Sequence, residues 1–308
     1  MRQVVTKEIN SCWCGRDVTN QFEIRSYDYS YRTCANQFTF ALCDCGSYVL
    51  VNRPVDEELP NIYPQNYLAY SPSQSRLVTT IRALNFRLKI RVVKKVMKHG
   101  FITTWLDYGA GAGELALNLR HMGVPRVFVV DAHSSIQSVL KQRELFVLKP
   151  EQLEELENVD VVSALQVIEH VPDPFGLLSE FFRLLRPGGI VLLETPSPAG
   201  LDFKIGRGGK WGGWHAPRHF YVFSESSLCA MIESVGFQIV SCTNIPSPYI
   251  WSETLRALLD GTRGGKFISF VTIRNPLFIV VAVAIEACLR LVRFKTSNQR
   301  IIAIKPSL

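Results

Sequence analysis

The apolar positions of residues 76–245 fall into short continuous runs separated by segments with helical spacing. A continuous apolar run is typical of a strand covered on both faces, as in a parallel sheet. We interpret as strands Thr103–Asp107, Arg126–Asp131, Val159–Leu165, Ile190–Glu194, Phe237–Ser241 and the final run Arg300–Lys305. We interpret as helices Glu114–Met122, Ser134–Arg143, Leu177–Leu185 and a segment that opens at Ser224 and ends at Gly236. The pattern predicts an α/β fold with helices on both faces of a mostly parallel sheet.

Three segments of different composition divide the chain. Residues 1–52 contain five of the eight cysteines and few helix signals, which predicts a small cysteine-bearing module. Residues 53–75 are rich in Pro, Tyr, Asn and Ser, so we expect an irregular linker. Residues 76–308 carry the α/β pattern, interrupted at about 246–296 by an apolar insertion with basic flanks.

The bulk composition narrows the class of protein. Hydrophobic residues make up 47% of the 308 residues, which excludes a disordered chain. The formal net charge of +7 fits attraction to anionic lipids, nucleic acids or phosphorylated substrates, but it also fits a mildly basic protein without such a partner. No apolar run reaches the roughly 18 residues of a membrane span. Residues 1–10 lack the apolar core of a signal peptide, so we expect a cytoplasmic protein with reduced cysteines.

A glycine-rich turn, LDYGAGAGE over residues 106–114, follows the first predicted strand and opens a predicted helix. Glycines let the backbone turn sharply and approach a ligand closely. Asp131 ends the next predicted strand about 20 residues later, at the spacing of an acid that accepts hydrogen bonds from ribose hydroxyls. The pattern predicts a nucleoside-cofactor site, with a tight turn that binds nothing as the alternative.

The order of glycines distinguishes between cofactors. Dinucleotide-binding proteins usually show Gly-x-Gly-x-x-Gly, whereas this turn is Gly-x-Gly-x-Gly preceded by Asp107. It resembles motif I of the class I S-adenosylmethionine-dependent methyltransferases. Further segments resemble that family in the same order, namely ALQVIEHVPDP at 164–174, LLRPGG at 184–189, ETPS at 194–197 and WHAPRHFYVFS at 214–224. The resemblance covers roughly residues 100–245 and the final strand, and it implies a Rossmann-like, mostly parallel seven-stranded sheet.

The resemblance also implies S-adenosylmethionine as the methyl donor. In the family, the acid and the first glycines of motif I line the methionine end of the cofactor, and the acid after the second strand binds the ribose. The cofactor-binding residues implied here are Asp107, Gly109, Gly111, Gly113, Asp131 and Gln166.

Methyl transfer to a hydroxyl or an acidic carbon requires a group that removes a proton, for which histidine is suited near neutral pH. His219 is the first candidate, because its segment is similar to the one that carries the base in sugar C-methyltransferases, although Arg218 stands where that family has Glu. His170 is the second candidate, with a structural role as the alternative. The acceptor implied is a small molecule, a sugar or a lipid-linked glycan precursor. We expect Trp211 and Trp214, in a glycine-rich stretch, either to close over the acceptor or to pack in an ordinary loop.

Cys12, Cys14, Cys43 and Cys45 form two Cys-x-Cys pairs, each followed by glycine. Four thiolates suit structural zinc, although Cys-x-x-Cys is the commoner spacing. Related sugar methyltransferases carry an N-terminal zinc-binding module before a Tyr-rich linker, so the resemblance implies a zinc-ribbon-like module. Unliganded thiols are the alternative, and Cys34 is a possible substitute ligand.

Two segments combine apolar and basic residues. Residues 81–98 place Ile81, Leu84, Leu88, Val92 and Val96 near one helical face and Lys and Arg on the other. This helix would pack on the sheet or lie on an anionic membrane. Residues 263–295 have basic ends and an apolar middle, which predicts peripheral membrane contact, a cover for the active site or a dimer interface.

Three other functions compete with a sugar or lipid-linked glycan methyltransferase. The third glycine comes too early for a nucleotide-dependent oxidoreductase. A non-catalytic cofactor-binding protein would share the motifs but lack turnover. A nucleic-acid methyltransferase would fit the charge, but the segment at 164–174 lacks the Asn/Asp-Pro-Pro-aromatic signature of amino-directed DNA enzymes.

Overall fold

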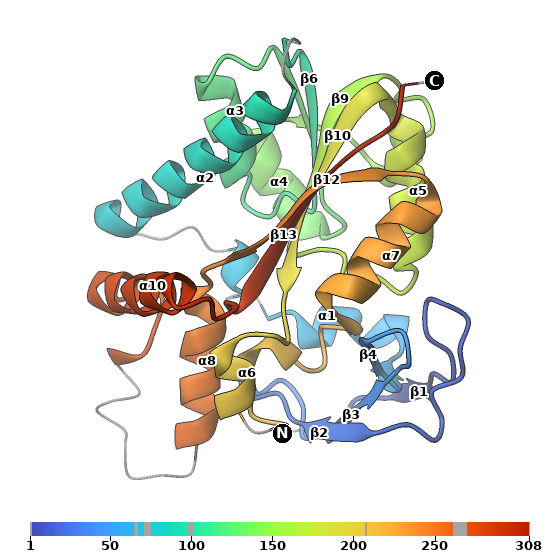
Figure 1. Cartoon of the computed structure of the whole chain (residues 1–308), viewed down its shortest axis with the longest axis vertical. Coiled ribbons are helices and arrows are strands. Elements are labelled where there is room, and N and C mark those ends of the chain that lie inside the picture. Colours follow the sequence, from blue (N-terminus) through green and yellow to red (C-terminus); the bar gives the residue numbers. More distant parts are fainter. Residues whose placement is uncertain are drawn as a thin grey trace.

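The computed structural model describes residues 2–64, 67–70, 75–97, 101–206, 208–260 and 270–307, and a seven-stranded sheet lies at its centre (Figure 1). Its strands are β6 (Thr104–Tyr108), β7 (Arg126–Val130), β8 (Phe146–Val147), β9 (Val159–Leu165), β10 (Leu185–Pro196), β12 (Gln238–Ile245) and β13 (Asn298–Ile304). Their order is β12-β13-β10-β9-β6-β7-β8. β13 pairs antiparallel with both neighbours, and the other pairs are parallel. The prediction of a Rossmann-like, mostly parallel seven-stranded sheet is confirmed.

Helices cover both faces of this sheet because its central strands are apolar on both sides. Trp105 of β6 packs in one buried cluster with Ile90, whereas its neighbour Leu106 lies in the other cluster with Phe181. The helices of the first face are α2 (Arg76–Val96), α3 (Glu114–His121) and α4 (Ser134–Gln142). Those of the second face are α5 (Pro174–Leu184) and α7 (Glu225–Val235). This is the layered arrangement that continuous apolar runs predict.

Most element boundaries follow local signals in the sequence. The Ser224 side chain accepts a hydrogen bond from the N–H of Ser227 and caps α7, and Gly236 ends that helix with φ at +110°. The main difference lies at residues 187–189, which we predicted to separate a helix from a strand. They belong to β10 instead, whose pairing with β9 shifts register between Leu185 and Ile190. A β-bulge of this kind accommodates Pro and Gly within a strand.

The first 54 residues form two small sheets at one end of the molecule, coloured blue in Figure 1. β1 (Thr6–Glu8) pairs with β5 (Asn52–Pro54), and β2 (Glu23–Ser26), β3 (Phe38–Leu42) and β4 (Ser47–Leu50) form a meander. β11 (Tyr221–Phe223), from the loop after the central strands, adds to β4 as a fourth strand. One buried cluster includes Phe40 of this region and Phe223 of β11. The N-terminal region therefore packs directly on the segment that contains His219.

The other helices and 3-10 turns are short, apart from two in the predicted insertion. The turns and small helices are η1 (Asp56–Glu58), α1 (Leu59–Ile62), η2 (Leu68–Tyr70), η3 (Pro150–Leu153), α6 (Leu201–Ile205) and η4 (Gly212–Trp214). The insertion contributes α8 (Pro248–Leu259) and α10 (Pro276–Leu291), and its residues 261–269 lie outside the described residues. Within the described chain, no helix combines the length and the apolar character that crossing a membrane requires.

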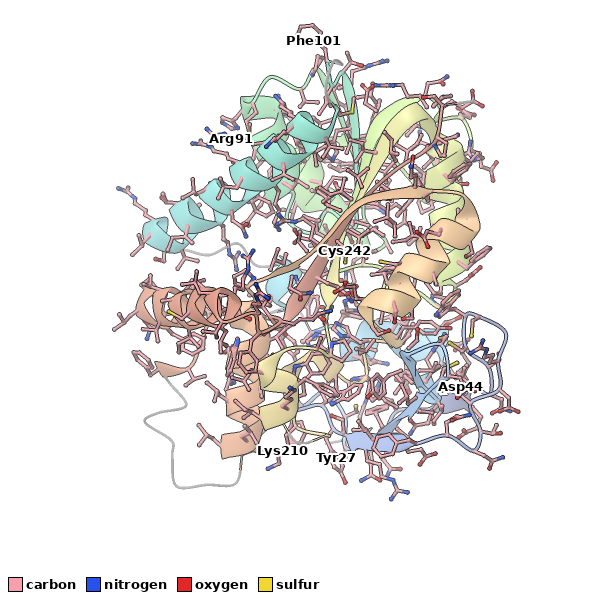
Figure 2. All side chains as sticks on the ribbon, in the orientation of Figure 1. Tyr27, Asp44, Arg91, Phe101, Lys210 and Cys242 are labelled. Carbon is pink, nitrogen blue, oxygen red and sulfur yellow. The ribbon has the colours of Figure 1, made fainter. Side chains whose placement is uncertain are left out.

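The orientation of α2, which the sequence left open, follows from the residues that it buries. Val78, Ile90 and Val93 face the sheet, together with Lys89, whose ammonium donates to Glu194 at 2.6 Å. The apolar residues predicted for one face lie partly on the outer side instead, where Leu84, Leu88 and Val92 are exposed. The neighbouring Arg91 is also exposed (Figure 2). The outer side of α2 is therefore both apolar and basic.

Candidate active site

The turn between β6 and α3 is built from glycines with left-handed backbone conformation. The φ angle is +71° at Gly109, +50° at Gly111 and +76° at Gly113. A Cβ atom at Gly109 would lie 2.4 Å from Cγ2 of Val167, so only glycine fits there. The N–H of Gly109 donates to the Val130 carbonyl at 2.8 Å, which ties the turn to the end of β7.

Asp131 follows β7 and holds the same turn from the other side. Its Oδ2 accepts a hydrogen bond from the N–H of Gly111 at 2.9 Å, and its Oδ1 accepts one from the N–H of His133 at 3.0 Å. Burial raises the pKa of this carboxyl although both N–H donors oppose the shift. A carboxylate offers about four acceptor positions, so two remain for the hydroxyls of a ligand.

Asp107 and Gln166 lie at the carboxyl ends of the neighbouring strands. Burial raises the pKa of Asp107 to about 7, although Ser163 Oγ donates to its Oδ1 at 2.9 Å. Gln166 follows β9 with φ at +58°, and its Nε2 donates to Asn298 Oδ1 at 3.2 Å. In the sheet, β6 lies between β7 and β9. The chain runs from β6 through β7 to β8 at one edge and then returns to β9 on the other side of β6, so the strand order reverses at β6. In open α/β sheets this reversal point is where ligands bind.

Three histidines, of which His215 and His219 are buried and His170 is half-buried, form a cluster beyond these strand ends. His170 follows β9, and His215 and His219 lie in the loop before β11. The ring centroids of His170 and His219 are 4.6 Å apart, and those of His215 and His219 are 4.9 Å apart. Burial lowers the pKa of His170 to about 4 and holds the pKa values of His215 and His219 well below their usual range. All three rings are therefore neutral at pH 7 and each retains one nitrogen lone pair.

Tyrosines of the linker and of α8 surround these histidines. The Tyr63 hydroxyl lies 3.1 Å from Nδ1 of His170, and the Tyr67 hydroxyl lies 3.4 Å from Nε2 of His215. Tyr249 of α8 approaches Nδ1 of His215 at 3.2 Å. The predicted irregular linker thus forms one wall of the cluster.

Arg218 departs from the Glu of the resembling family, and its environment explains the difference. Its guanidinium binds both carboxylate oxygens of Asp28 at 3.0 Å, and both side chains are fully buried. Its Nε donates to the Ile62 carbonyl at 2.7 Å, and the Tyr31 ring lies 4.6 Å from its Cζ. Arg218 therefore fastens the histidine loop to the N-terminal region and to the linker.

Of the two alternatives for Trp211 and Trp214, the structure supports packing and not closure over an acceptor. Both side chains are at most 2% exposed. Trp211 Nε1 donates to Asp202 at 2.6 Å, and Trp214 packs against Phe40 with ring centroids 4.6 Å apart. The two tryptophans are core residues that join the loop to the N-terminal sheet, which corresponds to the alternative of ordinary packing.

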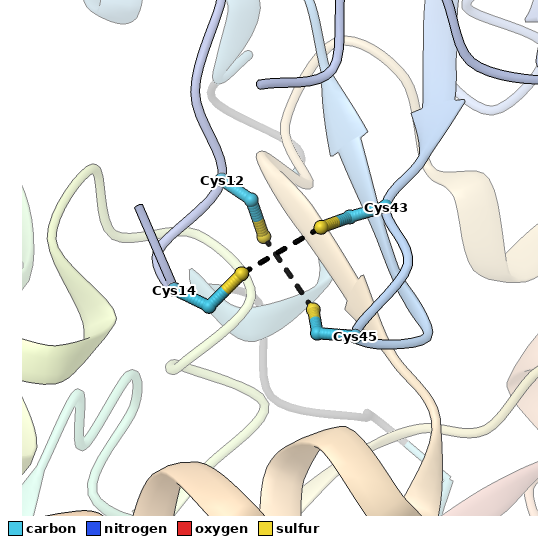
Figure 3. Close-up of side chains that lie close together, drawn as sticks. All are labelled: Cys12, Cys14, Cys43 and Cys45. Carbon is cyan, nitrogen blue, oxygen red and sulfur yellow. Dashed lines mark hydrogen bonds between the residues drawn. The ribbon is translucent and has the colours of Figure 1, made fainter. Parts of the chain in front are cut away.

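The four cysteines of the two Cys-x-Cys pairs meet at one point (Figure 3). The sulfur of Cys12 is 3.7 Å from that of Cys45, and the sulfur of Cys14 is 3.6 Å from that of Cys43. In a tetrahedron with metal–sulfur bonds of about 2.3 Å, the sulfur–sulfur edges are about 3.8 Å. A disulfide would need about 2.05 Å. Cys34 is buried outside this group, so it is not the substitute ligand that the sequence allowed.

Residues 67–242, more than half of the 308 residues, match the family model of a methyltransferase domain. The chain belongs to the methyltransferase-domain family. The match contains the glycine turn, Asp131 and the three clustered histidines. The prediction of a class I S-adenosylmethionine-dependent methyltransferase domain is thereby confirmed at the level of the family.

Individual relatives agree with this assignment. A protein of Mycolicibacterium smegmatis named as a probable S-adenosylmethionine-dependent methyltransferase is 33% identical over 111 residues, which are 36% of this chain and 39% of that protein. A ubiquinone biosynthesis O-methyltransferase of Paramagnetospirillum magneticum is 35% identical over 100 residues, covering 30% and 40%. The chain thus matches only about two fifths of the length of these curated relatives.

A solved structure shares the fold of this methyltransferase. Phosphoethanolamine N-methyltransferase 2 of Haemonchus contortus, in complex with S-adenosyl-L-methionine, superposes with a TM-score of 0.50 at 16% identity. The superposition covers 94% of this chain and 68% of that chain. At this identity the likeness concerns the fold alone.

The methyltransferase site includes residues that the sequence did not indicate. Glu169 is fully buried beside His170, and Asp28 lies 190 positions before its partner Arg218. Tyr249 comes from the insertion. The nearest signal was the Glu-His pair of the motif at 164–174, of which we singled out the histidine because its usual pKa lies near neutral pH.

Proposed function

We propose that this protein transfers a methyl group from S-adenosylmethionine to a small-molecule acceptor. The observation that carries the proposal is the Gly109–Gly113 turn, held open by Asp131 at the reversal point of the sheet. Asp107, Gly109, Gly111 and Gly113 would face the methionine end, Asp131 would bind the ribose, and Gln166 would contact the cofactor from the next strand. Bound S-adenosylmethionine supplies a methyl group on a positively charged sulfur.

The chain's own contribution to catalysis would come from His219 and His170. His219 Nδ1 lies 2.8 Å from the Gly213 carbonyl, which can only accept, so Nδ1 carries the hydrogen and Nε2 keeps its lone pair. That nitrogen would take the proton that a hydroxyl or an acidic carbon loses. His170, whose ring centroid lies 4.6 Å from that of His219, would support this role. The Tyr63 and Tyr67 wall would exclude water and position the acceptor.

We also propose that Cys12, Cys14, Cys43 and Cys45 bind structural zinc in a module made of residues 1–52. The sulfur separations near 3.7 Å and the four-thiolate donor set support this. The linker would be residues 53–75 and the methyltransferase domain residues 76–308. Metal analysis of the purified protein should give one zinc per chain, and Cys45→Ser should remove it. Four thiols that react freely in a metal-free, folded protein would contradict the proposal.

We further propose that the acceptor is a sugar or a lipid-linked glycan precursor and that the insertion contacts an anionic membrane. α10 exposes Leu277, Val280 and Ile285, and the exposed charges from Arg274 to Lys295 are basic while Glu286 is buried. The helix α2, whose exposed residues are also apolar and basic, lies on the same side of the molecule as α10 in Figure 1. Apolar residues flanked by cations suit the surface of an anionic bilayer. Sedimentation with anionic but not neutral vesicles would support this contact, and equal recovery with both would contradict it.

The decisive test of activity is the transfer of label from methyl-labelled S-adenosylmethionine into fractions of an extract from the source cells. We expect label in a lipid or glycan fraction, and its loss with Asp131→Ala. Labelled nucleic acid would favour a nucleic-acid methyltransferase. Cofactor binding without labelled product in any fraction would favour a non-catalytic cofactor-binding protein of the same fold.

A further inference from the structure

A second group of side chains of the kinds that bind metals lies within the histidine cluster. Glu169 and His170 follow β9, and His219 comes from the loop before β11. One carboxylate oxygen of Glu169 and one ring nitrogen of each histidine all lie within 4.8 Å of one another. Within the described residues, the cysteine group and this one are the two such groups, and their donor atoms differ in kind.

The hydrogen bonds of the two histidines leave one lone pair on each ring. His170 Nδ1 lies 3.0 Å from the Arg218 carbonyl, and His219 Nδ1 lies 2.8 Å from the Gly213 carbonyl. Since a carbonyl only accepts, Nδ1 is the protonated nitrogen of both rings and Nε2 is the basic one. Metal-binding histidines usually have this arrangement, with the other ring N–H donated to a carbonyl or carboxylate.

Glu169 adds an acceptor that has no partner. Its Oε2 accepts a hydrogen bond from Thr195 Oγ1 at 2.9 Å, whereas its Oε1 is buried without a hydrogen bond. The residue is 0% exposed. A buried carboxylate oxygen without a donor or cation costs several kcal/mol, about 1–3 for an uncharged group and more for a charged one. The unpaired oxygen therefore points to a cation that belongs between these groups.

The positive charge of Arg218 does not fill that role. Its two terminal nitrogens bind the carboxylate of Asp28, and its Nε binds the Ile62 carbonyl. His215, the third histidine, is buried, and its ring nitrogens lie near the hydroxyls of Tyr67 and Tyr249. Glu169 Oε1 therefore has no hydrogen-bond partner in the part of the chain that the structure describes, although Thr195 Oγ1 donates to Oε2 of the same carboxylate.

We propose that Glu169, His170 and His219 bind a divalent transition-metal ion. Two imidazoles and one carboxylate suit Zn²⁺, Fe²⁺, Mn²⁺ or Co²⁺ and leave coordination positions open, unlike the four thiolates of the cysteine cluster. With the ion bound, His219 Nε2 would be a ligand instead of the proton acceptor. An open position of the ion would then bind an oxygen atom of the acceptor and lower the pKa of its hydroxyl, which favours a hydroxyl-bearing acceptor. Only this use of the ion rests on the proposed function, because the binding itself requires neither S-adenosylmethionine nor acceptor. The competing occupant is a proton shared between Glu169 and a histidine.

The test is a titration of the full chain, purified with its cysteine cluster loaded with zinc, against Mn²⁺ alone, followed by electron paramagnetic resonance of the free ion. Thiolates favour zinc over Mn²⁺, so the probe reports on sites with nitrogen and oxygen ligands. We expect one Mn²⁺ per chain, with affinity at least about tenfold weaker in Glu169→Gln and in His219→Ala. His121→Ala is the matched control, since His121 is exposed and its ring forms a hydrogen bond with the Leu117 carbonyl of its own helix.

A measurement on the unmodified protein covers the case that the variants do not fold. Electron spin-echo modulation of bound Mn²⁺ should show nitrogen couplings from two histidine rings. Absence of saturable binding, binding without nitrogen coupling, or equal binding in the folded Glu169→Gln variant would each overturn the proposal. Because neither readout involves methyl transfer, metal binding in an inactive protein would contradict the proposed function and leave the metal site standing.

Discussion

The two halves of the candidate active site are built in different ways. The cofactor half is local, since the Gly109–Gly113 turn, Asp107 and Asp131 lie within 25 consecutive residues and are fixed by backbone hydrogen bonds. The acceptor half is assembled from distant segments, with Asp28, Tyr63, His170, Arg218 and Tyr249 brought together by the N-terminal sheet and the insertion.

This difference separates what the fold provides from what the chain adds to it. The cofactor half uses strand ends that any sheet of this order offers. The acceptor half depends on β11 joining β4, so that the N-terminal region forms part of the same buried cluster as the histidine loop. Changes in the cofactor half should therefore affect binding of the methyl donor, whereas changes in the acceptor half should affect turnover or stability and leave donor binding intact.

The largest expected effect is that of His219→Ala on turnover. Loss of the group that takes the acceptor's proton should lower the rate of methyl transfer about 10²- to 10⁴-fold. The affinity for S-adenosylmethionine, measured by calorimetry, should stay within about twofold. His121→Ala should change neither quantity. A His219→Ala variant with normal turnover would remove this residue from the mechanism.

A comparable effect, on stability, should follow from Arg218→Met. The change leaves the carboxylate of Asp28 buried without its cation, which typically costs about 3–5 kcal/mol of unfolding free energy. The double variant Asp28→Asn/Arg218→Met should regain most of that loss, because the amide removes the charge and keeps an acceptor for the N–H of Thr33. Denaturant unfolding measures both, and equal stabilities of the single and double variants would contradict the account.

The ion pair of Asp28 and Arg218 also predicts how the stability of the unmodified protein depends on pH. Burial alone would raise the pKa of Asp28, but Arg218 and the Thr33 hydrogen bonds outweigh burial and lower it. A group with a lowered folded-state pKa stabilises the fold above its unfolded pKa of about 3.9, and this contribution is lost as the pH falls through the folded value. Below about pH 4 the protein should therefore lose stability more steeply than the double variant does.

A smaller effect is expected from Asp131→Ala, which should weaken S-adenosylmethionine binding about 10- to 100-fold. Hydrogen bonds to a charged acceptor contribute about 1.5–3 kcal/mol, and this carboxylate also holds the N–H of Gly111. Asp56→Ala, at an exposed acid in η1, is the control for a lost negative charge. Calorimetry measures both affinities, and an unchanged affinity in a folded Asp131→Ala variant would place the ribose elsewhere.

The smallest effect should be the pH dependence of donor binding. Because burial raises the pKa of Asp107 to about 7, its carboxyl gains a negative charge as the pH rises through that value. If Asp107 faces the ammonium group of the methionine end, affinity should rise up to about tenfold between about pH 6 and pH 7.5. Asp107→Asn should bind with little pH dependence over that range. A steep dependence that persists in this variant would assign the titration to another group.

The sequence predicted the sheet and the glycine turn beside Asp131 because their signals are local. A Gly-rich turn between a strand and a helix, with an acid after the next strand, specifies its own geometry. The Cys12–Cys14 and Cys43–Cys45 pairs could be read in the same way, and the four sulfurs do lie together.

The acceptor half could not be predicted from spacing, since Asp28 and Arg218 are 190 positions apart and their pairing depends on how two sheets join. The side of α2 that would be exposed was left open for a similar reason. Helical periodicity identifies an apolar face, but it does not say whether that face meets the sheet or the solvent.

The central claim is that S-adenosylmethionine binds at the Gly109–Gly113 turn beside Asp131. Isothermal titration calorimetry of the full chain with S-adenosylmethionine tests it most directly. We predict saturable binding of one molecule per chain, greatly weakened by Asp131→Ala and unaffected by His219→Ala. A folded protein that shows no binding up to about 1 mM, or binding that is indifferent to Asp131, would contradict the account.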